Sequence, residues 1–482
     1  MHFAFRPLPA GPEGYAEPKT TAHHRLANAC GAPKDRLNSL TAARGRTKPL
    51  KGEQMSIFVR RTAGIAAASA MAFGLFLSTA SAGTASPQAV VETYADIAQA
   101  AYEDSLATAG ALDAAIAALI AKPSQATLLA ARAAWIAARA PYQQTEVFRF
   151  GNAIVDDWEG KVNAWPLDEG LIDYVAASYG TEADENALYT VNVIANASLT
   201  INGRKVDAST ITPALLQDSL HEAEEVEANV ATGYHALEFL LWGQDLNGTE
   251  AGAGSRPASD FDTANCTGGH CDRRAQYLKA ASELLLSDLA DMAANWGADG
   301  EARNTLLADP QAGLSAILTG MGSLSYGELA GERMKLGLLL HDPEEEHDCF
   351  SDNTHNSHYF DQLGVRNVYT GRYRRIDGSV VDGPSVSDLV AAADTGLDAE
   401  IRTKLETTVT AMAVMKARAE SVEAYDQMIG EANAQGNAVV QTAIDGLIDQ
   451  TRSIERAVAT LNLGAIAFEG SDSLDNPGAV FE

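Results

Sequence analysis

The sequence predicts an all-α protein made of two similar four-helix-bundle domains, with short β-hairpins in long loops. Apolar residues recur every three or four positions over most of the chain, which is the pattern of amphipathic helices, and β-prone runs are few. Two hairpin-like segments also match each other at a distance of 175 residues. This match indicates that the second half of the chain arose by internal duplication.

The N-terminal part is not expected to belong to the bundles. The segment MSIFVRRTAGIAAASAMAFGLFLSTASAG, from Met55, has two arginines, an apolar stretch and small residues at Ala80 and Ala82, as secretory signals do. We therefore expect residues 55–82 to be a signal peptide and residues 1–54 to be an upstream leader or a misassigned start. The exported chain is then periplasmic or associated with the cell envelope, without a transmembrane span.

Charge limits the classes of partner. The chain has 64 acidic and 35 basic side chains, and its net charge is −29. Such a surface repels nucleic acid and attracts cations, so we expect no nucleic-acid partner. On charge alone, a solubilising surface without a specific partner is the more common meaning.

Helical periodicity is clearest in residues 90–120 and 124–150. Comparable segments cover about 213–231, 234–242, 273–296, 311–340, 385–433 and 435–460. A Gly/Ser/Asp-rich stretch from 247 to 271 separates the earlier segments from the later ones. We therefore expect a first helical bundle over residues 83–250 and a second over residues 271–482.

The two hairpin signals are an Asn-Gly at 202–203 and an Asp-Gly at 377–378, both typical of type I′ turns. A shift of 175 residues aligns them without a gap, and it also aligns Thr212 with Ser387 as helix caps. Chance similarity of two hairpins is the alternative to duplication.

Two cysteines, Cys266 and Cys271, lie close together in NCTGGHCDRR. In an oxidising compartment this spacing favours a small disulfide loop, with a metal site that uses His270 as the alternative. Cys349 is then an odd thiol.

The stretch GYHALEFLLWGQD contains His235 and Glu238 in an apolar run. Three residues apart on a helix, the two side chains share a face and can bind one ion or hydrogen-bond each other. A buried carboxylate needs a cation, donors or a proton. Gly233 is expected to break the preceding helix, and a first-turn position keeps the imidazole neutral, as a metal ligand must be. A core hydrogen bond without an ion remains the alternative.

A second candidate region, residues 324–361, contains Glu328 and Glu332 four residues apart, with Arg333 as a charge partner. Oxygen-rich groups with a few imidazoles suit iron, manganese or calcium. Four of the ten histidines also fall there: His341, His347, His355 and His358. The acidic run 344–346 is expected to be a solvated loop.

A third set is Glu146 and Arg149 in QTEVFRFGN, followed by Asp168 in the loop WPLDEGLIDYV. The signatures of common hydrolases are missing from the sequence. It has no HExxH, GxSxG, P-loop or dinucleotide fingerprint.

These motifs together resemble the imelysin-like family, in particular its iron-regulated protein A branch. The matching segments are GYHALE at 233–238, which fits the family's GxHxxE, LAGERM at 329–334 and EEEHDCFSDNTH at 344–355. WPLDEGLIDYV and CTGGHCDRRAQYL fit too, so the resemblance spans about residues 90–460.

The resemblance implies two similar four-helix bundles with the functional site at their interface, in an exported protein linked to bacterial iron uptake. It identifies His235 and Glu238 as the motif pair. Our own inference from facing helices adds Glu146 and Glu328 as metal ligands and Arg149, Glu332 and Arg333 as binding residues. We also expect Asp168, Asp352 and His355 to be binding residues.

The leading hypothesis is an exported protein that binds iron, or a ferric chelate, between the bundles and serves envelope iron-transport partners. Because some members of the family are classed as metallopeptidases, a zinc-dependent peptidase is the rival. A non-catalytic interaction module, whose polar core only fixes how the helices pack, is the third.

Overall fold

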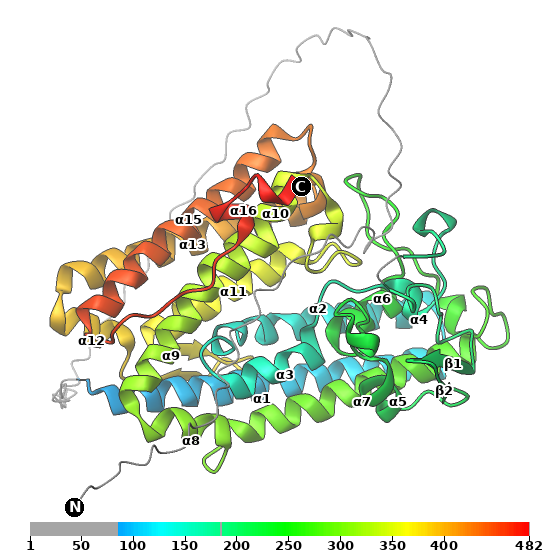
Figure 1. Ribbon diagram of the computed structural model, residues 1–482, viewed down its shortest axis with the longest axis horizontal. Helices are drawn as coiled ribbons and strands as arrows, with labels where there is room; N and C mark the ends of the chain where they lie inside the picture. Colours follow the sequence, from blue (N-terminus) through cyan, green and yellow to red (C-terminus); the bar gives the residue numbers. More distant parts are fainter. Residues whose placement is uncertain (1–84, 184–185, 482) are drawn as a thin grey trace, which may run out of the picture.

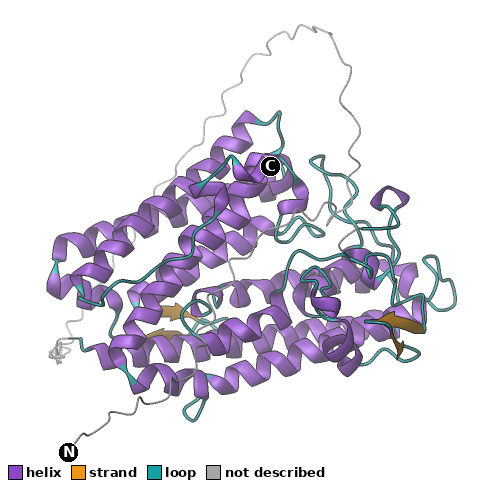
Figure 2. Cartoon of the chain, viewed as in Figure 1, coloured by secondary structure: helices purple, strands orange, loops and turns teal. Residues whose placement is uncertain are grey.

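The computed structural model describes residues 85–183 and 186–481. This part of the chain is mostly helical, with two short antiparallel hairpins that lie well apart (Figure 2). The all-α prediction is confirmed. The expected signal peptide and leader, residues 55–82 and 1–54, lie outside the described residues.

One group of helices packs around the longest helix, α1. Ser86 caps α1 and a proline occupies its first turn, while a Ser124–Thr127 capping box starts α2. The apolar faces of the group enclose Trp135 and Tyr277, which are fully buried. Its members are α1 (Pro87–Ala121), α2 (Gln125–Gln143), α3 (Ala153–Asn163), α6 (Gly233–Trp242), α7 (Cys271–Asn295) and α8 (Glu301–Ala308).

A second group forms the other bundle in Figure 1, coloured from yellow-green to orange. Helix α9 runs without a break through the π-helical segment η6 into α10, and these pack on α15. Helix α11, which the periodicity did not predict, packs on α13. The members are α9 (Pro310–Ser323), η6 (Leu324–Lys335), α10 (Leu336–Leu340), α11 (Thr354–Thr370), α12 (Val386–Ala393), α13 (Thr395–Ser421), α14 (Tyr425–Ile429) and α15 (Ala434–Thr460).

The two bundles touch where α2 packs on α11 and α1 on α9. Helix α7 follows the predicted boundary in sequence, yet it packs along α1 and α6 of the first group. The division into residues 83–250 and 271–482 stays a prediction. Packing would assign α7 to the first bundle.

Helix α1 is the one described helix that is long and apolar enough to cross a membrane, by length and composition only. Its residues Val91, Leu112 and Ile116 are buried, and the helix packs on α2 and α7. About a third of its most apolar stretch is buried inside the protein.

The hairpins differ in their turns. Strands β1 (Ser198–Ile201) and β2 (Arg204–Asp207) are joined by Asn202 and Gly203, both with positive φ, as a type I′ turn requires. Strands β3 (Arg372–Arg374) and β4 (Val380–Asp382) are joined by five residues, of which only Gly378 has positive φ. The second type I′ prediction is therefore wrong. The helix after this hairpin is capped by Ser385, not by Ser387.

The predicted helix over residues 213–231 is also wrong. It is replaced by α5 (Pro213–Leu215), η3 (Leu216–Leu220) and η4 (Ala223–Glu225). Left-handed backbone at Glu222, Glu224 and Glu225 interrupts the helical path. The predicted helix over 385–433 is divided at Asp394, which caps α13, and again at residues 422–424.

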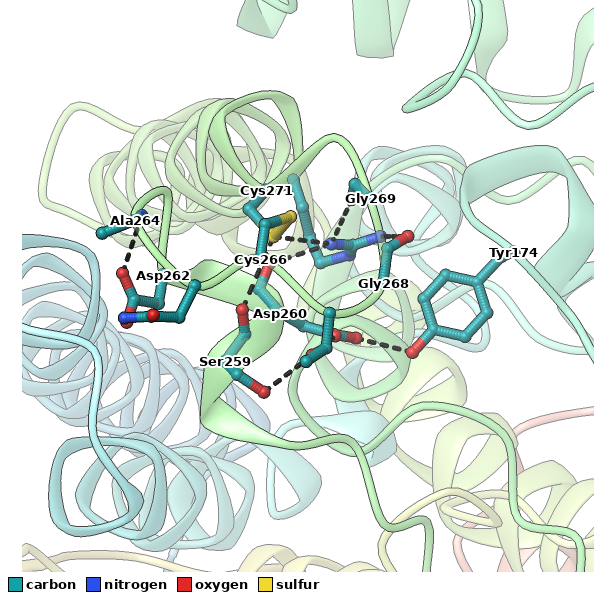
Figure 3. Close-up of a disulfide and its surroundings, with 12 residues drawn as sticks. Tyr174, Ser259, Asp260, Asp262, Ala264, Cys266, Gly268, Gly269 and Cys271 are labelled. Carbon is teal, nitrogen blue, oxygen red and sulfur yellow. Dashed lines mark hydrogen bonds between the residues drawn. A yellow bond between two sulfur atoms is a disulfide. The ribbon is translucent and has the colours of Figure 1, made fainter.

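The long loops are tied down by a disulfide and a buried ion network. Cys266 and Cys271 are bonded, and Tyr174 donates to Asp260 nearby (2.5 Å; Figure 3). Arg274 donates two hydrogen bonds to Asp173 (2.6 and 2.8 Å), which anchors WPLDEGLIDYV to α7.

Cys349 is disulfide-bonded too, so the expectation of an odd thiol is wrong. The other short elements are η1 (Glu146–Phe148), α4 (Glu169–Ile172), η2 (Ala177–Tyr179), η5 (Ala258–Phe261), η7 (Pro343–Glu345), α16 (Asp472–Asp475) and η8 (Ala479–Phe481).

Candidate metal centre

Helix α6 carries the GxHxxE stretch, and all ten of its residues are buried. It starts at Gly233, which has φ +78 and packs so tightly that a Cβ would lie 2.3 Å from the carbonyl oxygen of Val162. Only glycine fits there, and its turn sets the helix start. His235 therefore lies in the first turn, with Glu238 on the same face.

His235 and Glu238 bond to each other. His235 Nδ1 lies 3.1 Å from Glu238 Oε2, while Glu238 Oε1 accepts from the backbone N (3.0 Å) and Oγ (2.6 Å) of Ser351. The other ring nitrogen, His235 Nε2, is buried without a hydrogen-bond partner. A core hydrogen bond thus accounts for only one side of the ring.

His235 lies beside His347 and Asp348, from the loop between η7 and α11. The two imidazole rings are 4.7 Å apart at their centroids and nearly perpendicular. One ligand atom from each of His235, His347 and Asp348 lies within 4.8 Å of the others. Within the described ranges, this is the one group of three or more such side chains so close together.

Asp348 is held in place from three sides. Arg139 Nη2 of α2 donates to Asp348 Oδ1 (2.7 Å), while Asn353 (2.8 Å) and Ser357 (2.5 Å) donate to Oδ2. Arg139 is itself fully buried, and its guanidinium lies over the rings of Trp135, Tyr142 and Tyr234. We call His235, Glu238, His347, Asp348 and Arg139 the histidine cluster.

The charge states suit a ligand set. Burial lowers the pKa of His235 to about 3, and the nearby Arg139 acts in the same direction. Burial, followed by the Arg333 charge, holds the pKa of His347 well below its ordinary value. Burial alone would raise the pKa of Asp348, but the Arg139 charge outweighs it and lowers that pKa to about 2. Two neutral imidazoles and one carboxylate therefore meet at neutral pH.

Glu146 and Glu328 are not in this group. Arg333 Nη2 donates to Glu146 Oε2 (2.6 Å), Nε to Glu328 Oε1 (2.8 Å), and Nη1 lies 3.3 Å from Asp361 Oδ2. The π-helical form of η6 stacks residues five apart, which brings Glu328 and Arg333 together. We call these four residues the arginine cluster.

Gln143 connects the two clusters. In the amide orientation that satisfies both of its ends, its nitrogen donates to Asp361 Oδ1 (2.6 Å) and its oxygen accepts from the Arg139 guanidinium. The predicted ligands Glu146 and Glu328 thus lie beside the histidine cluster, the first buried and the second partly exposed, and the Arg333 guanidinium pairs with both carboxylates.

The other predicted binding residues are dispersed. Arg149 bonds Asp156 (2.9 Å) and lies 3.6 Å from Glu328, at the partly exposed edge of the arginine cluster. Asp168 accepts from Asn186, and burial raises its pKa to about 6. The loop WPLDEGLIDYV instead reaches the histidine cluster through Trp165, whose ring centroid is 5.9 Å from that of His347.

Glu332 is partly exposed and lies near Glu345 rather than in either cluster. His355 on α11 contacts Asn356, and burial lowers its pKa to about 4. Asp352 points to another group of acids, which includes Glu346. Glu346 is only 1% exposed, so the expectation that residues 344–346 form a solvated loop is wrong there.

The sequence did not single out three members of the cluster. His347 and Asp348 lie inside EEEHDCFSDNTH, where the adjacent His-Asp pair was a signal that the acidic run obscured. Arg139 lies in ARAP within an ordinary amphipathic helix, and no local pattern marks it. Only the packing of α2 against the 343–353 loop brings it to the site.

Comparison with known proteins agrees with this picture. The model of the imelysin family, Peptidase_M75, matches residues 98–454. Iron-regulated protein A from Synechococcus elongatus is 42% identical over 55 residues, which is 11% of this chain and 15% of that protein.

A solved structure supports the fold. It is the crystal structure of a protein from Parabacteroides distasonis ATCC 8503 that is named as an iron-regulated protein A precursor. The TM-score is 0.56 at 19% identity, and the match covers 79% of this chain and 97% of that chain. Likeness at this identity concerns the fold alone.

Proposed function

This chain belongs to the imelysin family, and on that premise we propose that it is an exported protein of bacterial iron uptake that binds iron, or a ferric chelate, at the histidine cluster. Its 55-residue similarity to a protein named iron-regulated protein A supports the link to iron. The net charge of −29 favours attraction of cations to its surface.

One observation carries the assignment of the site. His235 Nε2 is buried without a hydrogen-bond partner, and His235 belongs to a group with His347 and Asp348 whose ligand atoms lie within 4.8 Å of one another. Leaving a buried polar atom unsatisfied costs about 1–3 kcal/mol, and a bound cation would remove that cost. In the tautomer in which Nδ1 donates to Glu238, the lone pair of Nε2 is free to bind a metal ion.

The donor set fits iron. Two imidazoles and one carboxylate suit iron, zinc or manganese, and no thiolate is among the three clustered side chains. The positions are fixed, because Glu238 orients His235 while Arg139, Asn353 and Ser357 orient Asp348. Such preorganisation favours tight binding of an ion.

Metal titration of the purified protein tests this proposal. We expect one iron ion per chain, and a loss of at least about tenfold in affinity in His235→Ala and in His347→Ala. Exposed His270, which has positive φ, supplies the matched control His270→Asn, which should bind as the parent does. Unchanged iron affinity in both cluster variants would remove the assignment.

The name of the family model also suggests a peptidase, which in our alternative hypothesis would depend on zinc. The geometry favours binding over hydrolysis, because both oxygens of Glu238 are engaged and His235, His347 and Asp348 are each at most 2% exposed. A general base needs a free oxygen near the attacking water. Chelator-sensitive cleavage of an unfolded protein, absent in His235→Ala, would establish the peptidase instead.

A further inference from the structure

Four acidic side chains from three separate segments form a second polar group, which we call the acid pocket. Asp245 follows α6, Glu346 and Asp352 lie in the loop before α11, and Asp426 lies in α14. Asp245, Glu346 and Asp426 line one small cavity, together with Gly248, Pro343 and Cys349. The cavity thus joins the end of the GxHxxE helix to the second bundle.

Two carboxylates of the acid pocket are almost fully buried. Glu346 is 1% exposed and Asp426 is 2% exposed, and neither side chain forms a hydrogen bond of normal geometry, although Thr354 lies close enough to Glu346 to act on its pKa. Oδ1 of Asp352 is also buried without a partner. Asp245 differs, because its Oδ1 accepts from the backbone N (2.9 Å) and the Nδ2 (2.7 Å) of Asn247.

Basic side chains do not compensate these acids. Burial raises the pKa of Asp426 to about 7 and that of Asp352 to about 8, and the charges that add to these shifts are those of other carboxylates. In the described part of the chain, no basic side chain is among the leading influences on either group. Buried carboxylates in this state must hold protons or bind a cation.

Ligand type and flexibility decide which cation. Four carboxylates offer oxygen and no nitrogen, but no three of them have ligand atoms within 4.8 Å of one another in the described structure, so an ion must draw them together. Calcium takes six to eight oxygen ligands in a flexible geometry, whereas magnesium demands a near-ideal octahedron and keeps several waters. We propose that the acid pocket is a calcium site, separate from the histidine cluster. Bound calcium would fix the 343–353 loop, which also carries His347 and Asp348, against α14.

Calcium binding to the purified full chain, stripped with chelator, tests the site. We expect one calcium ion per chain by calorimetry and a rise of about 3 °C in Tm at a hundredfold excess over Kd. Asp426→Asn keeps the shape but removes a charged ligand, and it should weaken calcium binding at least about tenfold. Exposed Asp299 supplies the matched control, Asp299→Asn, with unchanged binding.

Two further measurements keep this inference distinct from the iron proposal. His235→Ala should retain calcium binding, and Asp426→Asn should retain a folded helical spectrum and bind iron within about threefold of the parent. The inference is overturned if the parent binds no calcium, or if Asp426→Asn binds it as tightly as the parent does. Either result would assign protons, not a cation, to these carboxylates.

Discussion

The histidine cluster and the acid pocket are both buried, acidic in part and separated by a short piece of one loop, yet they balance charge in opposite ways. In the first, Arg139 lies 2.7 Å from Asp348, and imidazoles occupy the remaining space. In the second, Glu346 and Asp426 meet other carboxylates. Glu346 and His347 are neighbours in sequence, so the contrast arises from what packs on each side of the loop.

This difference shows what each region needs from solution. The histidine cluster can fold without an ion, because its charges already pair, and a metal ion would satisfy only the free His235 Nε2. The acid pocket cannot be fully ionised at neutral pH without a cation. The four predictions below test this contrast, from the largest expected effect to the smallest.

The largest effect is expected from Arg139→Ala. Removing the guanidinium leaves Asp348 buried and unpaired, which lowers the free energy of unfolding by about 3–5 kcal/mol. Urea denaturation with chelator present measures it. Arg303→Ala, which breaks a partly exposed pair with Asp96, is the control and should lower the free energy of unfolding by at most about 1 kcal/mol. Equal losses would show that the histidine cluster is not balanced by Arg139.

Glu238→Gln tests whether the histidine cluster and the acid pocket bind their ions independently. The amide keeps the volume but cannot hold the imidazole as a carboxylate does, so iron affinity should fall about 10–100-fold. Calcium affinity at the acid pocket should stay the same. A parallel loss of both ions, measured by calorimetry, would mean that the two regions form one site.

Asp426→Asn is expected to stabilise the protein, whereas most substitutions in a protein core lower the free energy of unfolding. In chelator at pH 8 it removes a repelling charge among carboxylates, so we expect the free energy of unfolding to rise by about 1 kcal/mol. The shape-matched Asp299→Asn should leave it unchanged. A lower stability of Asp426→Asn would mean that its carboxylate has a stabilising contact in the folded protein.

The helices could be predicted because their periodicity is local. The GxHxxE helix is an example, since Gly233 and the apolar run from Leu237 to Trp242 fix both its start and its burial. Helix α11 was missed because its histidines and asparagines carry no apolar stripe, and packing on α13 stabilises it instead. The opposite error concerns residues 213–231, for which the apolar pattern predicted a helix. Residues with left-handed backbone interrupt that helix in the structure.

The site was predictable only in part, for a related reason. His235 and Glu238 lie on one helix, so spacing alone brings them together. The partners of His235 come from a loop more than a hundred residues away, and Arg139 comes from α2. Glu146 and Glu328 were sensible ligands by type, but pairing with Arg333 occupies them, and no spacing rule could reveal that.

The smallest effect is the net pH dependence, because the two regions act with opposite signs. The folded pKa of His235, about 3, lies below its ordinary value of roughly 6.5, so this group stabilises the fold above pH 6.5 and the contribution fades as pH falls toward 3. The folded pKa of Asp426, about 7, lies above its ordinary value of roughly 3.9. That contribution is present below pH 4 and is lost as pH rises through 7.

Between pH 5 and 7, acid therefore weakens the histidine cluster and strengthens the acid pocket, so the stability of the parent in chelator should change little. Asp426→Asn removes the proton uptake by which Asp426 stabilises the fold as pH falls. The free energy of unfolding of this variant should therefore fall more steeply than that of the parent between pH 7 and pH 5. Urea denaturation at pH 5, 6 and 7 measures both slopes. Parallel slopes would mean that Asp426 does not take up a proton in this window, and the contrast between the two regions would then be lost.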